Sequence, residues 1–186
     1  MKTVTLHSSG RIHLTLGWGV LVISLITYLL TLEPTISYWD CPEYVACAYG
    51  VQPGHPPGNP MWMLAARFFI NFAPDISFIP LMVNALSAVC SALTVLLTFL
   101  ATALLAGQLL PQEYPQGRIP VERIWLREGA GIVAALALCW SDTFWFSAVE
   151  AEVYAFSSLT TALLFWMTLV WSKNADKPHS DRLLIA

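Results

Sequence analysis

A short polar stretch of this chain places three ionisable side chains among prolines and glycines, directly after an uncharged apolar run. Residues 33–60 read EPTISYWDCPEYVACAYGVQPGHPPGNP and contain Asp40, Glu43 and His55. Charged side chains close to lipid are costly, so a group held by rigid turns is more typical of a reaction site than of a solubilising surface. An Asp fixed at the start of a helix can accept a proton from an incoming hydroxyl. The stretch therefore predicts acid–base chemistry beside a membrane.

The two acids also have a simpler interpretation. Asp40 precedes Cys41-Pro42-Glu43, a pattern that predicts a helix start with Asp40 as the N-cap. Glu43, three residues later, would then reach back in a capping box. Capping alone accounts for both acids, and a base at Asp40 would use the same geometry, so both interpretations stay open.

The loop 54–60 predicts a second helix start, with Asn59 as the N-cap and Pro60 in the first helical position. Free backbone N–H groups at such a start attract anions, and Arg67, two turns into the same helix, is suited to pair with phosphate. His55, Asn59 and Arg67 are therefore candidate phosphate-binding residues. The alternatives are that His55 is an ordinary turn residue and that Arg67 extends to lipid headgroups.

A second polar segment, residues 140–154, carries three more acids: Asp142, Glu150 and Glu152. Glu150 and Glu152 precede an apolar run, so they could simply complement the dipole of a helix that begins there. If both polar segments lie on one side of the membrane, acids that are far apart in sequence can form a convergent site.

The elements that must position these residues are apolar helices. Hydrophobic residues make up 56% of the 186 residues and charged residues 11%, and the mean hydropathy is +0.61. These values are typical of a protein that crosses the membrane several times. We expect an all-α polytopic membrane protein whose four spans are long enough to cross the hydrocarbon core: 14–32, 76–110, 129–146 and 153–171.

The segments between these spans have separate expected roles. The first outer loop, 33–75, is expected to contain a short interfacial helix at 61–72. This segment has only a dozen residues, which are too few to cross the membrane, and it contains an Arg. The loop 107–128 is expected to be a cytoplasmic connection. The run 14–32 could be a signal peptide, but it lacks a small-residue cleavage site and is interpreted as a retained anchor. Residues 181–186 resemble the opening of another apolar segment, so we expect the chain to be the N-terminal part of a larger protein.

The distribution of basic residues predicts the orientation. An N-terminus in the cytoplasm leaves only Arg67 of the nine Lys and Arg residues outside. The loop 33–75 and the turn 147–152 then share the outer face, which is periplasmic in a bacterium and lumenal in a eukaryote. The net charge of −3, without a basic stripe, gives no sign of a nucleic-acid partner. Cys41 and Cys47 would face the oxidising side, but their spacing decides neither a disulfide nor a zinc site.

Several motifs in these segments resemble those of a known family. They are YWDCPEY at 38–44, AYG at 48–50, GHPPG at 54–58 and EVYA at 152–155. Together they resemble bacterial membrane proteins related to protein O-mannosyltransferases, within the GT-C glycosyltransferases. The resemblance covers nearly the whole chain, and HPPG combined with an upstream WDxxE is fairly specific. It implies a bundle of many transmembrane helices with the site in the first outer loop.

The resemblance also implies an activity and roles for the site residues. Such enzymes transfer a sugar, here mannose, from a polyprenyl-phosphate carrier to a Ser or Thr hydroxyl of an exported protein. Asp40 matches the general base, Glu43 would support it, and Glu152 would complete the catalytic group from the second segment. His55, Arg67 and Asn59 would engage the carrier phosphate or its sugar.

The same resemblance implies a bacterial inner-membrane location with periplasmic active-site loops. The lipid-linked sugar is a substrate, and neither a metal nor a cofactor is demanded by the scheme. GT-C enzymes have at least seven spans, so a four-span piece is expected to be inactive alone.

Two other classes of membrane protein remain open. A transporter or flippase would place broken helices or charges near mid-span, and the second span has no charged residue, its polar residues being Asn84, Gln108 and several Ser and Thr. A non-catalytic assembly subunit would keep the helices yet tolerate the loss of Asp40.

Overall fold

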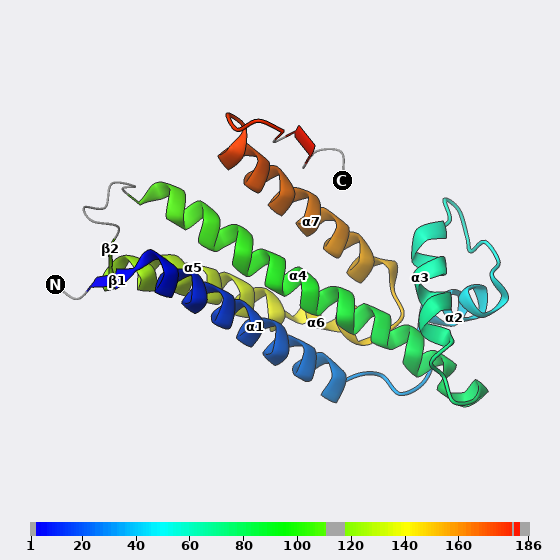
Figure 1. Cartoon of the computed structure of the whole chain (residues 1–186). Coiled ribbons are helices and arrows are strands. Elements are labelled where there is room, and N and C mark those ends of the chain that lie inside the picture. The colour runs from blue at the N-terminus through cyan, green and yellow to red at the C-terminus, as the bar shows by residue number, and fades with distance from the viewer. Residues whose placement is uncertain (1–2, 111–117, 180, 183–186) are drawn as a thin grey trace. The chain divides into compact units, whose positions relative to one another are not determined.

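The chain is almost entirely helical in the computed structural model, which describes residues 3–110, 118–179 and 181–182. The described helices, shown in Figure 1, are α1 (Leu6–Leu30), α2 (Cys41–Gly50), α3 (Pro60–Ile70), α4 (Ile79–Leu109), α5 (Val121–Cys139), α6 (Asp142–Val149) and α7 (Val153–Asn174). A single turn of 3-10 helix, Ile76–Phe78, leads into α4. The predicted all-α membrane class is therefore confirmed.

Three of these helices are long and apolar enough to cross a membrane. They cover His7–Leu30, Ile76–Leu109 and Val153–Asn174. A fourth span is present if α5 and α6, which are bent by 64° relative to each other, count as one. The short apolar helix α3 agrees with the interfacial helix expected at 61–72. By length and composition, the chain is a membrane protein.

The third span differs from the continuous helix expected at 129–146. Helix α5 already begins at Val121 and ends at Cys139, and α6 begins at Asp142 after an extended residue, Ser141. Most of the described residues in the expected connection, 107–128, are thus helical. The early start of α5 is possible because Glu128, buried within it, is paired with His13 and Arg127.

A two-stranded ribbon also has no signal in the sequence. Strand β1 (Thr3–Thr5) pairs antiparallel with β2 (Arg118–Pro120), with Val4 opposite Ile119. Strands of three residues are too short to show an alternating pattern. Residues 111–117 of the expected connection lie outside the described residues, as do four of the residues at 181–186.

The chain divides into two compact units. The first unit comprises Met1–Val22, Thr94–Leu138 and Thr160–Ala186, and the second comprises Ile23–Leu93 and Cys139–Leu159. Helices α1, α4 and α7 contribute residues to both. All the site residues predicted from the sequence belong to the second unit.

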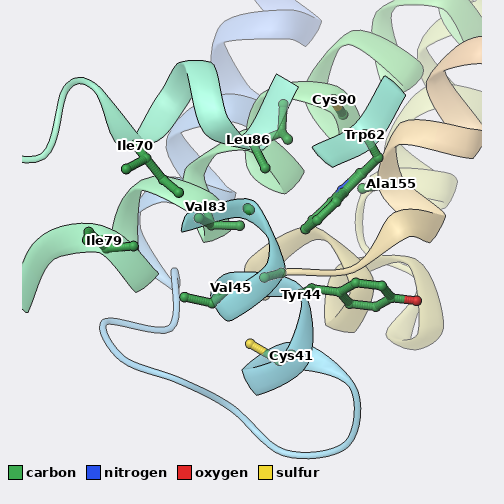
Figure 2. Packing of buried hydrophobic residues seen from close by; sticks show 13 residues of the cluster. Cys41, Tyr44, Val45, Trp62, Ile70, Ile79, Val83, Leu86, Cys90 and Ala155 are labelled. Carbon is green, nitrogen blue, oxygen red and sulfur yellow. The ribbon is translucent and has the colours of Figure 1, made fainter. Parts of the chain in front are cut away.

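The second unit has its own apolar core, which fixes α2 and α3 against the first part of α4. Both short helices bury residues three or four positions apart, the spacing of a single helix face. Figure 2 shows these side chains, which include Tyr44 and Val45 of α2, Trp62 of α3 and Val83 of α4. The rings of Tyr44 and Trp62 lie 5.0 Å apart. The loop between α2 and α3 is thereby anchored at both ends.

Buried polar groups hold the rest of the second unit. The Asn84 amide donates to the carbonyls of Glu33 and Thr35 at 2.7 and 2.9 Å, which fixes the start of the first outer loop to α4. The Tyr28 hydroxyl donates to the Cys139 carbonyl at 2.9 Å. That bond satisfies a carbonyl at the end of α5, where the helix ladder stops.

Candidate active site

Asp40 occupies the predicted position at the start of α2 but does not cap the helix with its side chain. The preceding Trp39 has a φ of 58°, a left-handed conformation that is uncommon for a bulky residue. The Asp40 carboxylate makes no cap hydrogen bond, and its side chain is 55% exposed. The capping interpretation of Asp40 is therefore wrong for the side chain, and the carboxylate remains open to a substrate.

Glu43 extends forward to the next loop instead of back to Asp40, so the predicted capping box is also wrong. Its Oε1 accepts from the backbone N–H of His55 at 2.6 Å, and its Oε2 lies 3.1 Å from Nδ1 of the same residue. The backbone N–H of His55, together with the imidazole, lowers the pKa of Glu43. A Cβ at Gly54 would lie 3.3 Å from Oε1, so the loop passes close to this carboxylate.

His55 is consequently more than a turn residue. With Nδ1 beside Glu43, its Nε2 lies 4.0 Å from Oδ2 of Asp40. Its ring lies 5.7 Å from that of Tyr44. The two ring nitrogens of His55 thus face two different carboxylates, Nδ1 that of Glu43 and Nε2 that of Asp40.

Glu150 and Glu152 lie in the extended break between α6 and α7. Their exposed fractions are only 3% and 7%. Burial raises the pKa of Glu152 to about 7, and the charges of Glu150 and Asp40 contribute to the rise. The first backbone N–H of α7, from Val153, and the charge of His55 act in the opposite direction. The helix-dipole interpretation thus accounts for the contact of Glu152 with the backbone N–H of Val153. It does not explain why Glu152 is buried beside other carboxylates.

The structure therefore brings together side chains from both polar segments within the second unit. We call Asp40, Glu43, His55, Glu150 and Glu152 the acid–histidine group. Each member acts electrostatically on at least one other member. Like charges at this density in a partly buried place are costly, which is typical of functional sites.

Two residues of this region were not selected from the sequence. Tyr44 is buried beside the group, and burial followed by the charges of Glu152 and Asp40 raises its pKa to about 12. Its position directly after Glu43 in the YWDCPEY motif was the available signal. Glu150 was named among the acids of a possible convergent site but was given no role of its own, and its burial depends on packing that the local sequence does not reveal.

The candidate phosphate-binding residues have mixed surroundings. Asn59 directly precedes α3 and Pro60 begins it, which confirms the predicted helix start, but the Asn59 side chain makes no cap hydrogen bond. It lines a small crevice with Tyr44 and Trp62. Arg67 donates to the Tyr49 carbonyl at 3.0 Å and lies 5.9 Å from the centre of the Tyr49 ring. Its described contacts thus join α3 to α2, and its role toward phosphate stays a prediction.

The cysteines and the acids of this region are residue types that can bind metal ions. Cys41 and Cys47 are both free thiols. Within the described ranges, no three His, Cys, Asp or Glu side chains are grouped so that they could hold a metal ion.

Comparison with known proteins gives one family. The model described as Protein O-mannosyl-transferase TMEM260 N-terminal domain matches residues 40–186, which is most of the chain. The match begins at Asp40 and includes the whole acid–histidine group. It agrees with the O-mannosyltransferase resemblance of the motifs, though it is not specific to bacteria. No solved structure matches the chain.

Proposed function

Because the chain belongs to the family of the protein O-mannosyl-transferase TMEM260 N-terminal domain, we propose that it is the N-terminal part of a GT-C-type membrane glycosyltransferase. The family's name points to a sugar donor and a protein acceptor. The finer proposal is transfer of mannose from a polyprenyl-phosphate carrier to a Ser or Thr hydroxyl of an exported protein. The observation that supports it most is the acid–histidine group, which joins acids from two segments of a membrane protein.

Asp40 is the general base of this proposal. The acceptor hydroxyl gives its proton to the Asp40 carboxylate while its oxygen bonds to the anomeric carbon of the sugar. The bond from that carbon to the phosphate oxygen breaks, and its electron pair leaves with the polyprenyl phosphate. Asp40 suits this role because its carboxylate is half exposed and makes no capping bond. Positioning the hydroxyl and accepting its proton lower the barrier to attack.

His55 and Asn59 act on the departing phosphate. His55 can offer a ring N–H, which stabilises an anion as it forms. Glu43 is a positioning residue, since its contacts hold the backbone and the ring of His55. Asn59 adds an amide at the start of α3, where backbone N–H groups favour anions. Arg67 could join them only if its guanidinium left the Tyr49 carbonyl.

Glu152 completes the group from the second segment. With a pKa of about 7, it is a mixture of acid and carboxylate at neutral pH. It can therefore both donate to and accept from the hydroxyls of a bound sugar. In its neutral form it also avoids repulsion with Asp40 and Glu150.

One observation favours a transporter as a second candidate function. The 64° break between α5 and α6 is the kind of discontinuous helix that transporters use near their substrates. A transporter would move the lipid-linked sugar across the membrane without breaking its bond to phosphate.

Replacing Asp40 with Asn in the complete protein tests the proposal. Loss of a general base should lower transfer from polyprenyl-phosphate mannose by roughly 10²- to 10⁴-fold while abundance and membrane insertion persist. Asp142→Asn is the matched control, because Asp142 is an exposed acid of the second segment outside the acid–histidine group. Unchanged transfer by Asp40→Asn would remove Asp40 from the role of base. Movement of the intact donor without any transfer by the wild-type protein would favour the transporter.

A further inference from the structure

The first unit contains a cavity of about 630 Å³ that the proposed transfer reaction does not use. Its lining comes from the beginning of α1, the end of α4, strand β2, the first half of α5 and the second half of α7. None of its lining residues belongs to the acid–histidine group. The cavity is therefore a separate candidate binding site.

Two basic side chains contribute to the cavity wall. Arg127 and Lys173 both line it, and so does His13. Arg127 is held in place, because its Nε donates to Glu128 at 2.7 Å and its Nη2 to the Ser9 hydroxyl at 3.0 Å. A Cβ at Gly107 would lie 3.3 Å from the Arg127 stem, so α4 passes close beside it.

The carboxylate that fixes this wall offsets one of its two positive charges, which leaves a net charge of about +1. Glu128 is 1% exposed, and it is shared between Arg127 and Nδ1 of His13, which is 2.8 Å away. The two N–H groups on Nη1 of Arg127 are not used by its contacts with Glu128 and Ser9. Lys173 adds an exposed ammonium. A fixed guanidinium with a mobile ammonium is well suited to bind a phosphate group.

The remainder of the wall is apolar. Leu104 lies one turn before Gln108 on α4, and Leu100 lies one turn further. On α7, Trp166 lies about two turns before Lys173. The lining thus changes along both helices from polar, near their ends, to apolar within the long hydrophobic segments. A ligand that fits this gradient has an anionic head and a hydrocarbon chain.

We propose that the cavity binds a lipid with a phosphate headgroup, which Arg127 and Lys173 hold while the chain lies along Leu100, Leu104 and Trp166. The proposal concerns binding alone and does not depend on sugar transfer. The proposal also gives the buried Glu128 of this apolar helix a role, because Glu128 orients Arg127 toward the headgroup.

Native mass spectrometry of the full chain in detergent tests this proposal, with phosphatidylglycerol, phosphatidylcholine and decaprenyl phosphate as probes. The anionic lipids should be retained more tightly than phosphatidylcholine. A Lys beside an anionic headgroup contributes roughly fivefold in affinity, so Lys173→Glu should weaken their binding by about 25-fold. Lys177→Glu is the matched control, since Lys177 donates to Asn174 and is not part of the lining, and it should change binding less than about twofold.

A second variant separates the cavity from general surface charge. Gly10 lines the cavity, and an added Cβ there would meet no atom within 4 Å. Gly10→Leu should therefore narrow the cavity without a clash and reduce retention of the anionic lipids at least tenfold, while the melting temperature stays within a few degrees of the wild type. Equal losses in the variants of Lys173 and Lys177, or full binding in Gly10→Leu, would overturn the proposal. So would equal retention of all three lipids. Displacement of the lipid by inorganic phosphate at equal concentration would show a free-anion site instead of a lipid site. A preference between the two anionic probes would identify the class of hydrocarbon chain that the cavity accepts.

Discussion

Asp40, directly before α2, and Glu43, in its first turn, lie three residues apart, yet their carboxylates have different surroundings. Glu43 is bonded to the backbone and the ring of His55, whereas Oδ2 of Asp40 lies 4.0 Å from Nε2 of His55. A carboxylate already engaged by two partners is a poor proton acceptor, and an open one is available to a substrate. This difference supports our proposal that Glu43 is a positioning residue and Asp40 the proton acceptor.

The positioning role predicts coupling between Glu43 and His55. Glu43→Gln should lower transfer by the complete protein about tenfold to a hundredfold, because the ring of His55 is no longer held by charge. A double-mutant cycle of kcat/KM with His55→Gln should give a coupling energy of about 1 kcal/mol or more, as for residues of one hydrogen-bonded network. Glu33→Gln, in the same loop but bonded to Thr35, serves as the control. Additive effects of the two changes would argue against positioning.

Glu152 predicts a pH dependence of stability. Its pKa is about 7 in the folded protein against 4.5 for an unperturbed Glu. The folded state therefore holds the proton more tightly, and this stabilisation, full below pH 4.5, is lost as pH rises through 7. Glu152→Gln removes the loss, so its stability relative to wild type should rise by up to about 3 kcal/mol between pH 4.5 and 8.

Thermal unfolding in detergent at several pH values measures this difference. Glu122→Gln, at an exposed position in the first turn of α5, is the matched control. A relative stability of Glu152→Gln that does not vary with pH would contradict the raised pKa.

For individual residues, the sequence predicted the starts of α2 and α3 better than it predicted the side-chain contacts there. Asn59 and Pro60 form the helix start that their own types dictate. The capping box failed because the backbone N–H of His55, twelve residues from Glu43, replaces the local partner. The approach of Glu152 to Asp40 depends on packing between segments more than a hundred residues apart, which no local pattern encodes.

Among the elements, α5 shows how closely two helices of the first unit approach. An added Cβ at Gly131 would lie 2.8 Å from Cδ2 of Phe99 and 3.0 Å from its carbonyl oxygen. Because that oxygen belongs to the backbone of α4, a methyl group there requires the helices to separate. At Gly129, two residues earlier, nothing lies within 4 Å.

The two glycines therefore form a matched pair. Gly131→Ala should destabilise the protein by about 1–3 kcal/mol through overpacking. Gly129→Ala should be neutral or stabilising by up to about 1 kcal/mol, since Gly is costly in a helix interior. Thermal unfolding of the purified chain compares them, and equal effects of the two changes would show that the close approach to Phe99 is not present.

The long helices were predictable because apolar length alone specifies them. The start of α5 was not, since Glu122, Arg123 and Glu128 read as a polar connection until the partners of Glu128 are known. The break at Ser141 was not predictable either, because apolar residues continue on both sides of it. Composition thus identifies membrane spans, while their ends depend on side-chain pairs distant in sequence.

At the scale of the whole molecule, the proposal requires that residues 33–75 lie on the outer side of the membrane. The basic residues predict this orientation through the positive-inside rule. In a chain whose four cysteines are replaced by Ala, a Cys introduced at Tyr38 should react with an impermeant maleimide in intact cells, because Tyr38 is 84% exposed. A Cys introduced at Lys177 should react only after the cells are permeabilised. The reverse pattern would contradict the orientation.

If the acids of two distant segments share one site, the ionisation of Glu152 reports on it directly. Its carboxyl titration can be followed by ¹³C NMR in the full chain with and without Asp40. Since the charge of Asp40 contributes to the raised pKa of Glu152, Asp40→Asn should lower that pKa, while Asp142→Asn should leave it unchanged. An identical titration of Glu152 in the wild type and in Asp40→Asn would contradict the account.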